Sequence, residues 1–134
     1  DKSEHQRLIR FWKYFWVAFQ TMDDICDITE QHDDKPVFAD IKEWQQTIIT
    51  NYIFTQTKQQ TKNEFSKYFA VDFSNHQNDK VKDIIKKSWA LTFAYKHFDE
   101  QMENALNALE YLNIRDKQKR YFQKLLWIIK QKVY

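Results

Sequence analysis

The sequence contains no glycine and a single proline, Pro36, among its 134 residues. Average usage would give about nine glycines in a chain of this length. Tight β-hairpins depend on glycine because their central residues need positive φ angles, whereas glycine and proline are the residues that most weaken a helix interior. The composition therefore argues against a hairpin-rich sheet protein and predicts an all-α fold.

Cysteine and long apolar runs are scarce as well. Cys26 is the only cysteine, so no disulfide can form within the chain. No apolar stretch approaches the ~20 residues that a membrane-spanning helix needs. We therefore expect no membrane span, and we predict a cytoplasmic location, with which a lone cysteine is compatible.

Apolar residues recur at steps of three and four along most of the chain, which predicts long amphipathic helices. The first is expected over residues 3–29, followed by a polar turn at residues 30–35. Pro36 suits the first turn of a second helix, because its missing N–H would be unpaired there anyway. This second helix is expected to be bent or split, since residues 55–64 contain no strongly apolar side chain.

The third predicted helix has the most regular pattern. Its apolar stripe runs without interruption from Val81 to Leu112, and Asn113 then separates it from a last helix. No internal repeat, low-complexity tract or linker marks a domain boundary. We therefore expect residues 1–134 to form one compact bundle of about four long, mostly antiparallel helices.

Three acidic residues stand close together near the end of the first predicted helix. Asp23, Asp24 and Asp27 form a D-D-x-x-D pattern, in which Asp23 and Asp27 project from the same side of a helix. Carboxylates so placed can hold a divalent cation that is bound to a diphosphate. The spacing resembles the aspartate-rich metal motif of isoprenoid diphosphate enzymes, and the resemblance implies a magnesium-dependent enzyme with these three ligands.

Two other interpretations of the acidic residues stay open. A helical nucleotide pyrophosphatase would use acidic pairs on facing helices, and Asp24 and Asp27 with Asp40 and Glu43 could supply them. Acidic residues are common in this chain, with 19 in total, so the favoured interpretation is a solvated acidic patch. On that basis we expect no catalytic residue, metal or cofactor, and we rank the enzyme third among the functions considered.

Aromatic residues make up 17% of the chain, and they are concentrated in the first predicted helix. One face of a helix cannot hide every aromatic side chain between residues 11 and 19. Trp12, Tyr14 and Trp16 are therefore candidates for an exposed contact surface, since Trp and Tyr are enriched at binding hot spots. Basic residues on the later helices, Lys86, Lys87 and Arg120, could form a rim that steers an acidic partner.

These features favour a non-enzymatic binding protein. We predict a module that docks an aromatic and basic helical surface onto a partner protein, as an inhibitor, immunity protein or adaptor does. The alternative is a helical bundle that binds a small apolar molecule, as a sensor or effector-binding domain. We do not expect nucleic-acid binding, because a formal net charge of +2 is a weak basic footprint.

Overall fold

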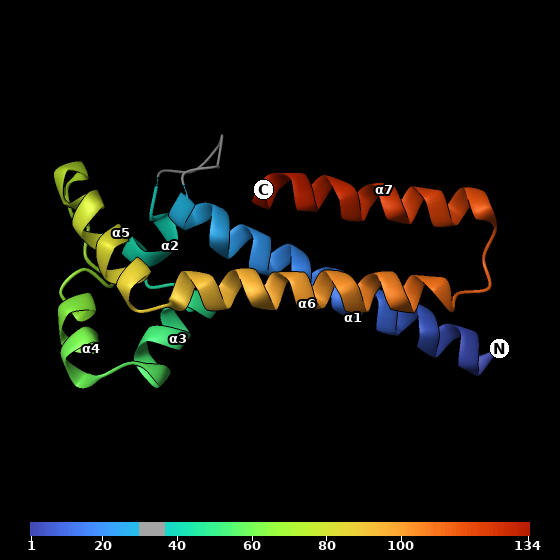
Figure 1. Cartoon of the computed structure of the whole chain (residues 1–134), viewed down its shortest axis with the longest axis horizontal. Helices are drawn as coiled ribbons and strands as arrows, with labels where there is room; N and C mark the ends of the chain where they lie inside the picture. Colours follow the sequence, from blue (N-terminus) through green and yellow to red (C-terminus); the bar gives the residue numbers. More distant parts are fainter. Residues whose placement is uncertain (30–36) are drawn as a thin grey trace. The chain divides into compact units, whose positions relative to one another are not determined.

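The computed structural model describes residues 1–29 and 37–134, and all regular structure in these residues is helical. The described residues form seven α-helices and one short 3₁₀-helix, Asn75–Gln77 (Figure 1). The all-α prediction is confirmed. The α-helices are α1 (Lys2–Thr29), α2 (Ala39–Lys42), α3 (Ile48–Gln56), α4 (Gln59–Ser66), α5 (Asn78–Lys87), α6 (Ala90–Glu110) and α7 (Asp116–Val133).

The chain divides into two compact units. The terminal unit contains residues 1–22 and 96–134, and the central unit contains residues 23–95. The single domain over residues 1–134 stays a prediction.

The terminal unit is built from the first part of α1, the last part of α6 and the whole of α7. The last two are antiparallel and are joined by the turn at residues 111–115 (Figure 1). Phe11, Phe98, Leu109 and Leu126 are almost completely buried in this unit. The first and last helices of the sequence prediction are thus confirmed, because each has an uninterrupted apolar stripe to bury.

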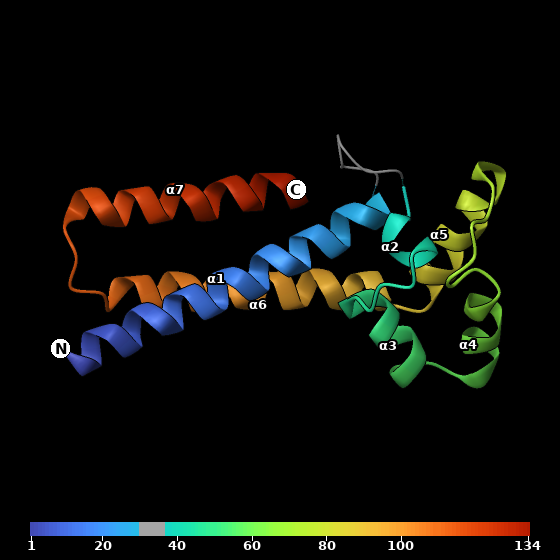
Figure 2. The same cartoon turned by 180° about the vertical axis from the view of Figure 1, so that it is seen from behind.

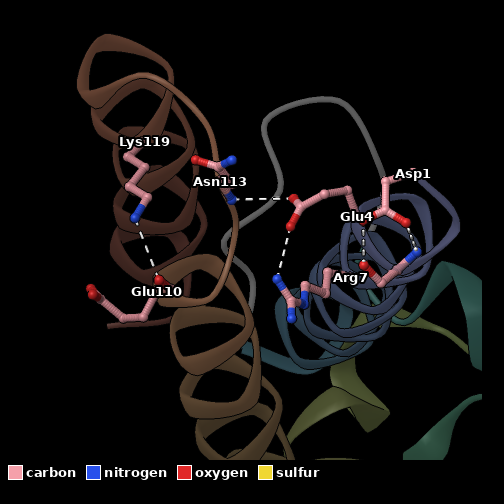
Figure 3. Close-up of polar contacts among 7 residues, drawn as sticks. Asp1, Glu4, Arg7, Glu110, Asn113 and Lys119 are labelled. Atoms are coloured by element: carbon pink, nitrogen blue, oxygen red, sulfur yellow. Dashed lines mark hydrogen bonds and ion pairs between the residues drawn. The ribbon is translucent and has the colours of Figure 1, made fainter.

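Polar contacts tie the turn at residues 111–115 to the start of α1 (Figure 3). The Glu4 carboxylate accepts a hydrogen bond from the Asn113 backbone N–H at 3.3 Å and pairs with the Arg7 guanidinium at 2.8 Å (Figure 3). Across the same turn, the Lys119 ammonium donates to the Glu110 carbonyl oxygen at 3.4 Å. These contacts hold the two ends of the turn, in which the chain reverses direction without a glycine.

The central unit contains the short helices α2 to α5 (Figure 2). Thr47 caps α3: its hydroxyl accepts from the Thr50 N–H at 3.1 Å, and the Thr50 hydroxyl accepts from the Thr47 N–H at 2.8 Å. Such reciprocal bonds satisfy N–H groups that have no partner inside a helix. Helix α4 packs against α3 and α5, and the rings of Phe54 and Phe69 contact the buried ring of Phe65.

The predicted number of about four helices is wrong for the described residues. The expected second helix is divided into α2, α3 and α4, and the expected third helix is divided into α5 and α6. The second break lies at Ser88 and Trp89, where Trp89 has a φ of 68° and cannot continue a right-handed helix. The predicted turn at residues 30–35 and the helix start at Pro36 lie outside the described residues.

Four of the residues that the structure describes adopt the left-handed conformation. Phe38, Trp44, Ala70 and Trp89 have φ between 61° and 68°. Phe38, Trp44 and Trp89 lie next to a helix end, and Ala70 lies in the turn after α4. A glycine at these positions would avoid the clash between Cβ and the backbone. That clash costs roughly 1–2 kcal/mol per residue. Because the sequence has no glycine, the turns between its helices carry this strain.

No helix in residues 1–29 and 37–134 is long and apolar enough to span a membrane. This agrees with the expected absence of a membrane span in that part of the chain.

Replacing Ala70 by glycine should stabilise the protein. Ala70 is exposed and has a φ of 61°, so the change removes only a strained Cβ and should raise the free energy of unfolding by about 1 kcal/mol. Urea unfolding followed by circular dichroism measures the change. The matched control Ala94→Gly, inside α6, should lower the free energy by at least about 1 kcal/mol; a lower stability for Ala70→Gly would refute the strain argument.

Candidate metal-binding site

Three carboxylates converge at the end of α1. One oxygen each from Asp23, Asp24 and Asp40 lies within 4.8 Å of the other two. Asp23 and Asp24 come from the last turns of α1 and are partly exposed, whereas Asp40 belongs to α2 and is 9% exposed. All three residues belong to the central unit.

Asp24 also holds the beginning of α3. Its Oδ2 accepts a hydrogen bond from the backbone N–H of Ile48, the first residue of that helix, at 3.0 Å. A negative charge at a helix N-terminus is stabilised by the helix dipole and by N–H groups that have no partner within the helix. This contact fixes the direction of the Asp24 carboxylate.

Asp27 is placed differently from the other aspartates of the D-D-x-x-D pattern. It is 1% exposed, and its Oδ1 accepts from the backbone N–H of Asp40 at 3.3 Å. Its carbonyl oxygen accepts from the Phe38 N–H at 3.2 Å. The structure therefore brings Asp23 and Asp24 together with Asp40, and it places Asp27 at the backbone that carries Asp40. Glu43, the other acidic candidate, is exposed and is not part of the converging group.

The converging carboxylates fit a hard divalent cation. Mg²⁺ prefers oxygen ligands at about 2.0–2.1 Å, so opposite ligands of one ion lie about 4.2 Å apart. A separation of at most 4.8 Å is close to that value. Mg²⁺ usually keeps several water molecules, and the partial exposure of Asp23 and Asp24 gives a hydrated ion and an anionic ligand access to the group.

The aromatic candidates of α1 have different surroundings. Trp12 is 41% exposed and its ring meets the rings of Phe15 and Phe122 edge-on, at 5.3 and 5.5 Å. Trp16 is 58% exposed and stacks on Phe19, and Tyr14 is half-buried. Trp12 is therefore part of the packing of the terminal unit, whereas Trp16 contributes less to it.

The basic candidates are all exposed but belong to different units. Lys86 and Lys87 lie in the last turn of α5, in the central unit, and Arg120 lies on α7. The Asp83 carboxylate lies 2.8 Å from the Lys87 ammonium, and this hydrogen-bonded ion pair raises the pKa of Lys87. Because the long third helix is broken, these lysines stand at a helix C-terminus, where the helix dipole favours positive charge.

The comparisons with known proteins identify a family. Residues 1–88, more than half of the chain, match the family model for polyprenyl synthetase. The chain belongs to the polyprenyl synthetase family.

Two curated relatives and one solved structure carry related names. The chain is 33% identical over 100 residues to a geranylgeranyl diphosphate synthase from Sulfolobus acidocaldarius. The aligned region covers 69% of this chain and 29% of that protein. The chain is 32% identical over 114 residues to an all-trans-nonaprenyl-diphosphate synthase (geranyl-diphosphate specific) from Rhodobacter capsulatus, covering 83% and 35%. The crystal structure of geranylgeranyl pyrophosphate synthetase from Pyrococcus horikoshii Ot3 matches with a TM-score of 0.79 and 25% identity, over 99% of this chain and 40% of that one.

The chain thus spans about a third of the length of the curated relatives that it matches. Membership of the polyprenyl synthetase family nevertheless overturns the prediction of a non-enzymatic binding module, because this is a family of enzymes. The inhibitor, immunity and adaptor roles, the sensor alternative and the expected protein partner are wrong for the same reason. The predicted docking surface was based on exposed aromatic and basic residues, and these residues are divided between the two units.

The two exposed tryptophans of α1 provide a test of this packing. Trp12→Ala should lower the free energy of unfolding by about 2–3 kcal/mol, because it removes a large side chain from an aromatic cluster. Trp16→Ala should lower it by less than about 1 kcal/mol, since its ring is mostly exposed and loses one stacking contact. Denaturant unfolding of both variants measures the difference, and equal losses would contradict the packing described here.

Proposed function

We propose that this chain supplies a divalent-cation and diphosphate site of a polyprenyl synthetase, in which Asp23, Asp24 and Asp40 bind Mg²⁺. The observation that carries the proposal is the convergence of these three carboxylates within 4.8 Å. All three lie within the residues that match the family model. The D-D-x-x-D spacing supports the same assignment through its resemblance to the aspartate-rich metal motif of isoprenoid diphosphate enzymes.

The proposed ligand is a diphosphate ester with an isoprenoid chain, which is the class of compound named in both relatives. A bound divalent cation supplies charge stabilisation for the diphosphate. The residues of this chain hold and orient the cation. The Asp24 carboxylate is fixed by the Ile48 N–H, and the Asp40 carboxylate comes close to it from α2. Because the chain covers 29–35% of these relatives, we assign it the binding of cation and diphosphate and assign the transfer reaction to a complete synthase fold. A cytoplasmic location is part of this proposal.

Titration of the whole chain with Mg²⁺ in the presence of inorganic diphosphate should show saturable binding by calorimetry. Asp23→Asn should weaken the Mg²⁺ affinity by about tenfold or more, because a ligand charge is lost. The matched control is Asp72→Asn, whose side chain is 97% exposed and lies outside the converging group; its affinity should equal that of the wild type. Absence of saturable binding to the wild-type chain would refute the proposed function.

A further inference from the structure

Helix α7 carries far more positive than negative charge. Its 18 residues include six lysines and arginines and one acidic residue, Asp116. Residues 96–110 of α6, which are antiparallel to α7 in the terminal unit (Figure 1), have the opposite balance, with four acidic residues and one lysine. Lys117 and Lys119 even stand in the first turn of α7, where cations oppose the helix dipole. Helix stability therefore does not account for this charge.

The exposed side of α7 combines cations with large apolar side chains. One side of the helix is buried in the terminal unit through apolar residues such as Leu126 and Ile129. On the other side, Trp127 is 58% exposed, Tyr121 is 61% exposed and Ile128 is 41% exposed. These three residues alternate with exposed basic and polar residues at helical steps of three and four. The basic face of α7 consists of Lys117, Arg120, Tyr121, Lys124, Trp127, Ile128 and Gln131, all of them exposed.

The mixture of residues on the basic face favours one kind of binding partner. A folded protein fits it poorly, because lysine is depleted in the cores of protein interfaces. A nucleic acid would account for the cations but not for Ile128, which has no ring to stack on a base. An anionic lipid surface fits both groups, because its phosphates attract lysine and arginine. Tryptophan, tyrosine and aliphatic side chains enter the boundary between headgroups and acyl chains.

An apolar groove continues the basic face towards α1. It is lined by the apolar side chains of Leu8, Ile114 and Phe122 and by Lys117 and Tyr121 of the basic face. All five residues belong to the terminal unit. The groove thus places open apolar surface beside a cation, and a phospholipid, with an acyl chain attached to an anionic headgroup, has the matching chemistry.

We propose that the basic face of α7 binds the surface of an anionic phospholipid bilayer, with α7 lying in the plane of the headgroups. No helix in the described part of the chain is long and apolar enough to span a membrane, so the proposed contact is peripheral. The inference does not rest on the proposed function, because α7 belongs to the terminal unit and the converging carboxylates belong to the central unit. Each lysine or arginine near an anionic surface strengthens the association about fivefold.

The experiment is co-sedimentation of the whole chain at low salt with two kinds of vesicle, one of phosphatidylglycerol and phosphatidylcholine in equal parts and one of phosphatidylcholine alone. The wild type should bind the anionic vesicles at least about tenfold more tightly than the zwitterionic ones. The triple variant Lys117→Gln, Arg120→Gln, Lys124→Gln should lose about 100-fold in affinity for the anionic vesicles, because three cations leave the basic face. Wild-type binding that is equal for both kinds of vesicle, or absent from both, would overturn the proposal.

A second triple variant separates the basic face from net charge. Lys58→Gln, Lys67→Gln, Lys80→Gln changes three exposed lysines of the central unit and lowers the net charge by the same amount. Its affinity should stay within about threefold of the wild type, since these lysines do not belong to the basic face. Equal losses in the two triple variants would refute a role of the basic face.

A pair of tryptophan variants tests the apolar part of the basic face. Trp127→Ala should weaken binding to the anionic vesicles about tenfold, because its ring no longer leaves water at the bilayer boundary. The matched control is Trp89→Ala, which removes a ring that is 67% exposed in the central unit and should leave the affinity within about twofold of the wild type. Equal effects of the two changes would contradict insertion of the basic face.

Two further measurements keep the result decisive. Thermal unfolding shows whether each variant is folded at the assay temperature, and if a triple variant is not, the tryptophan pair decides alone. A gel shift of duplex DNA by the wild type, without binding to vesicles, would assign the basic face to nucleic acid and overturn the proposal. Asp23→Asn should bind the anionic vesicles as the wild type does, so a failure of the proposed cation site leaves the lipid contact unaffected.

Discussion

The last two turns of α1 hold the beginnings of the two helices that follow it, and the site depends on this constraint. Asp24 accepts from the first N–H of α3, and Asp27 accepts from an N–H in the first turn of α2. These bonds fix α2 and the start of α3 against the acidic end of α1. The same segment carries Asp40, whose carboxylate converges with those of Asp23 and Asp24. A short acidic motif thus organises the backbone that follows it and also carries two carboxylates of the proposed cation site.

The absence of glycine shapes the same region. Phe38 stands where α2 begins, with a φ of 62°, a conformation that glycine adopts without penalty. Its side chain is fully buried and contacts the ring of Phe73 at 5.8 Å, and the burial of a phenylalanine contributes about 1.5–3 kcal/mol. That gain is as large as the cost of the left-handed conformation. Packing therefore stabilises a strained residue two positions from Asp40, so that the chain keeps a turn here without glycine.

The sequence allowed α1 and α7 to be predicted, because each has an apolar stripe that is continuous from end to end. It did not allow the break at Trp89 to be predicted. The three-four spacing continues through residues 84–91, and Ser88 and Trp89 carry neither the glycine nor the proline that normally ends a helix. The break depends on a left-handed residue and on the Ser88 hydroxyl, which donates to the Ile85 carbonyl and accepts from the Ala90 N–H. Such local bonds leave no trace in hydrophobic periodicity.

The acidic site was predictable only in part, because hydrophobic and helical periodicity do not show long-range hydrogen bonds. Helical spacing placed Asp23 and Asp27 on one side of α1, but spacing gives the direction of a side chain and not its burial. The difference between Asp27 and Asp23 arises from residues 38–40, which return to α1 through long-range hydrogen bonds. The large number of acidic residues in the chain favoured the interpretation of a solvated patch, because a count does not show which carboxylates the fold brings together. A solvated patch, however, would let its charges move apart, whereas here backbone N–H groups hold Asp24 and the segment of Asp40 in place. Carboxylate oxygens held within 4.8 Å of one another suit a hard divalent cation, and the proposed function rests on this fixed arrangement.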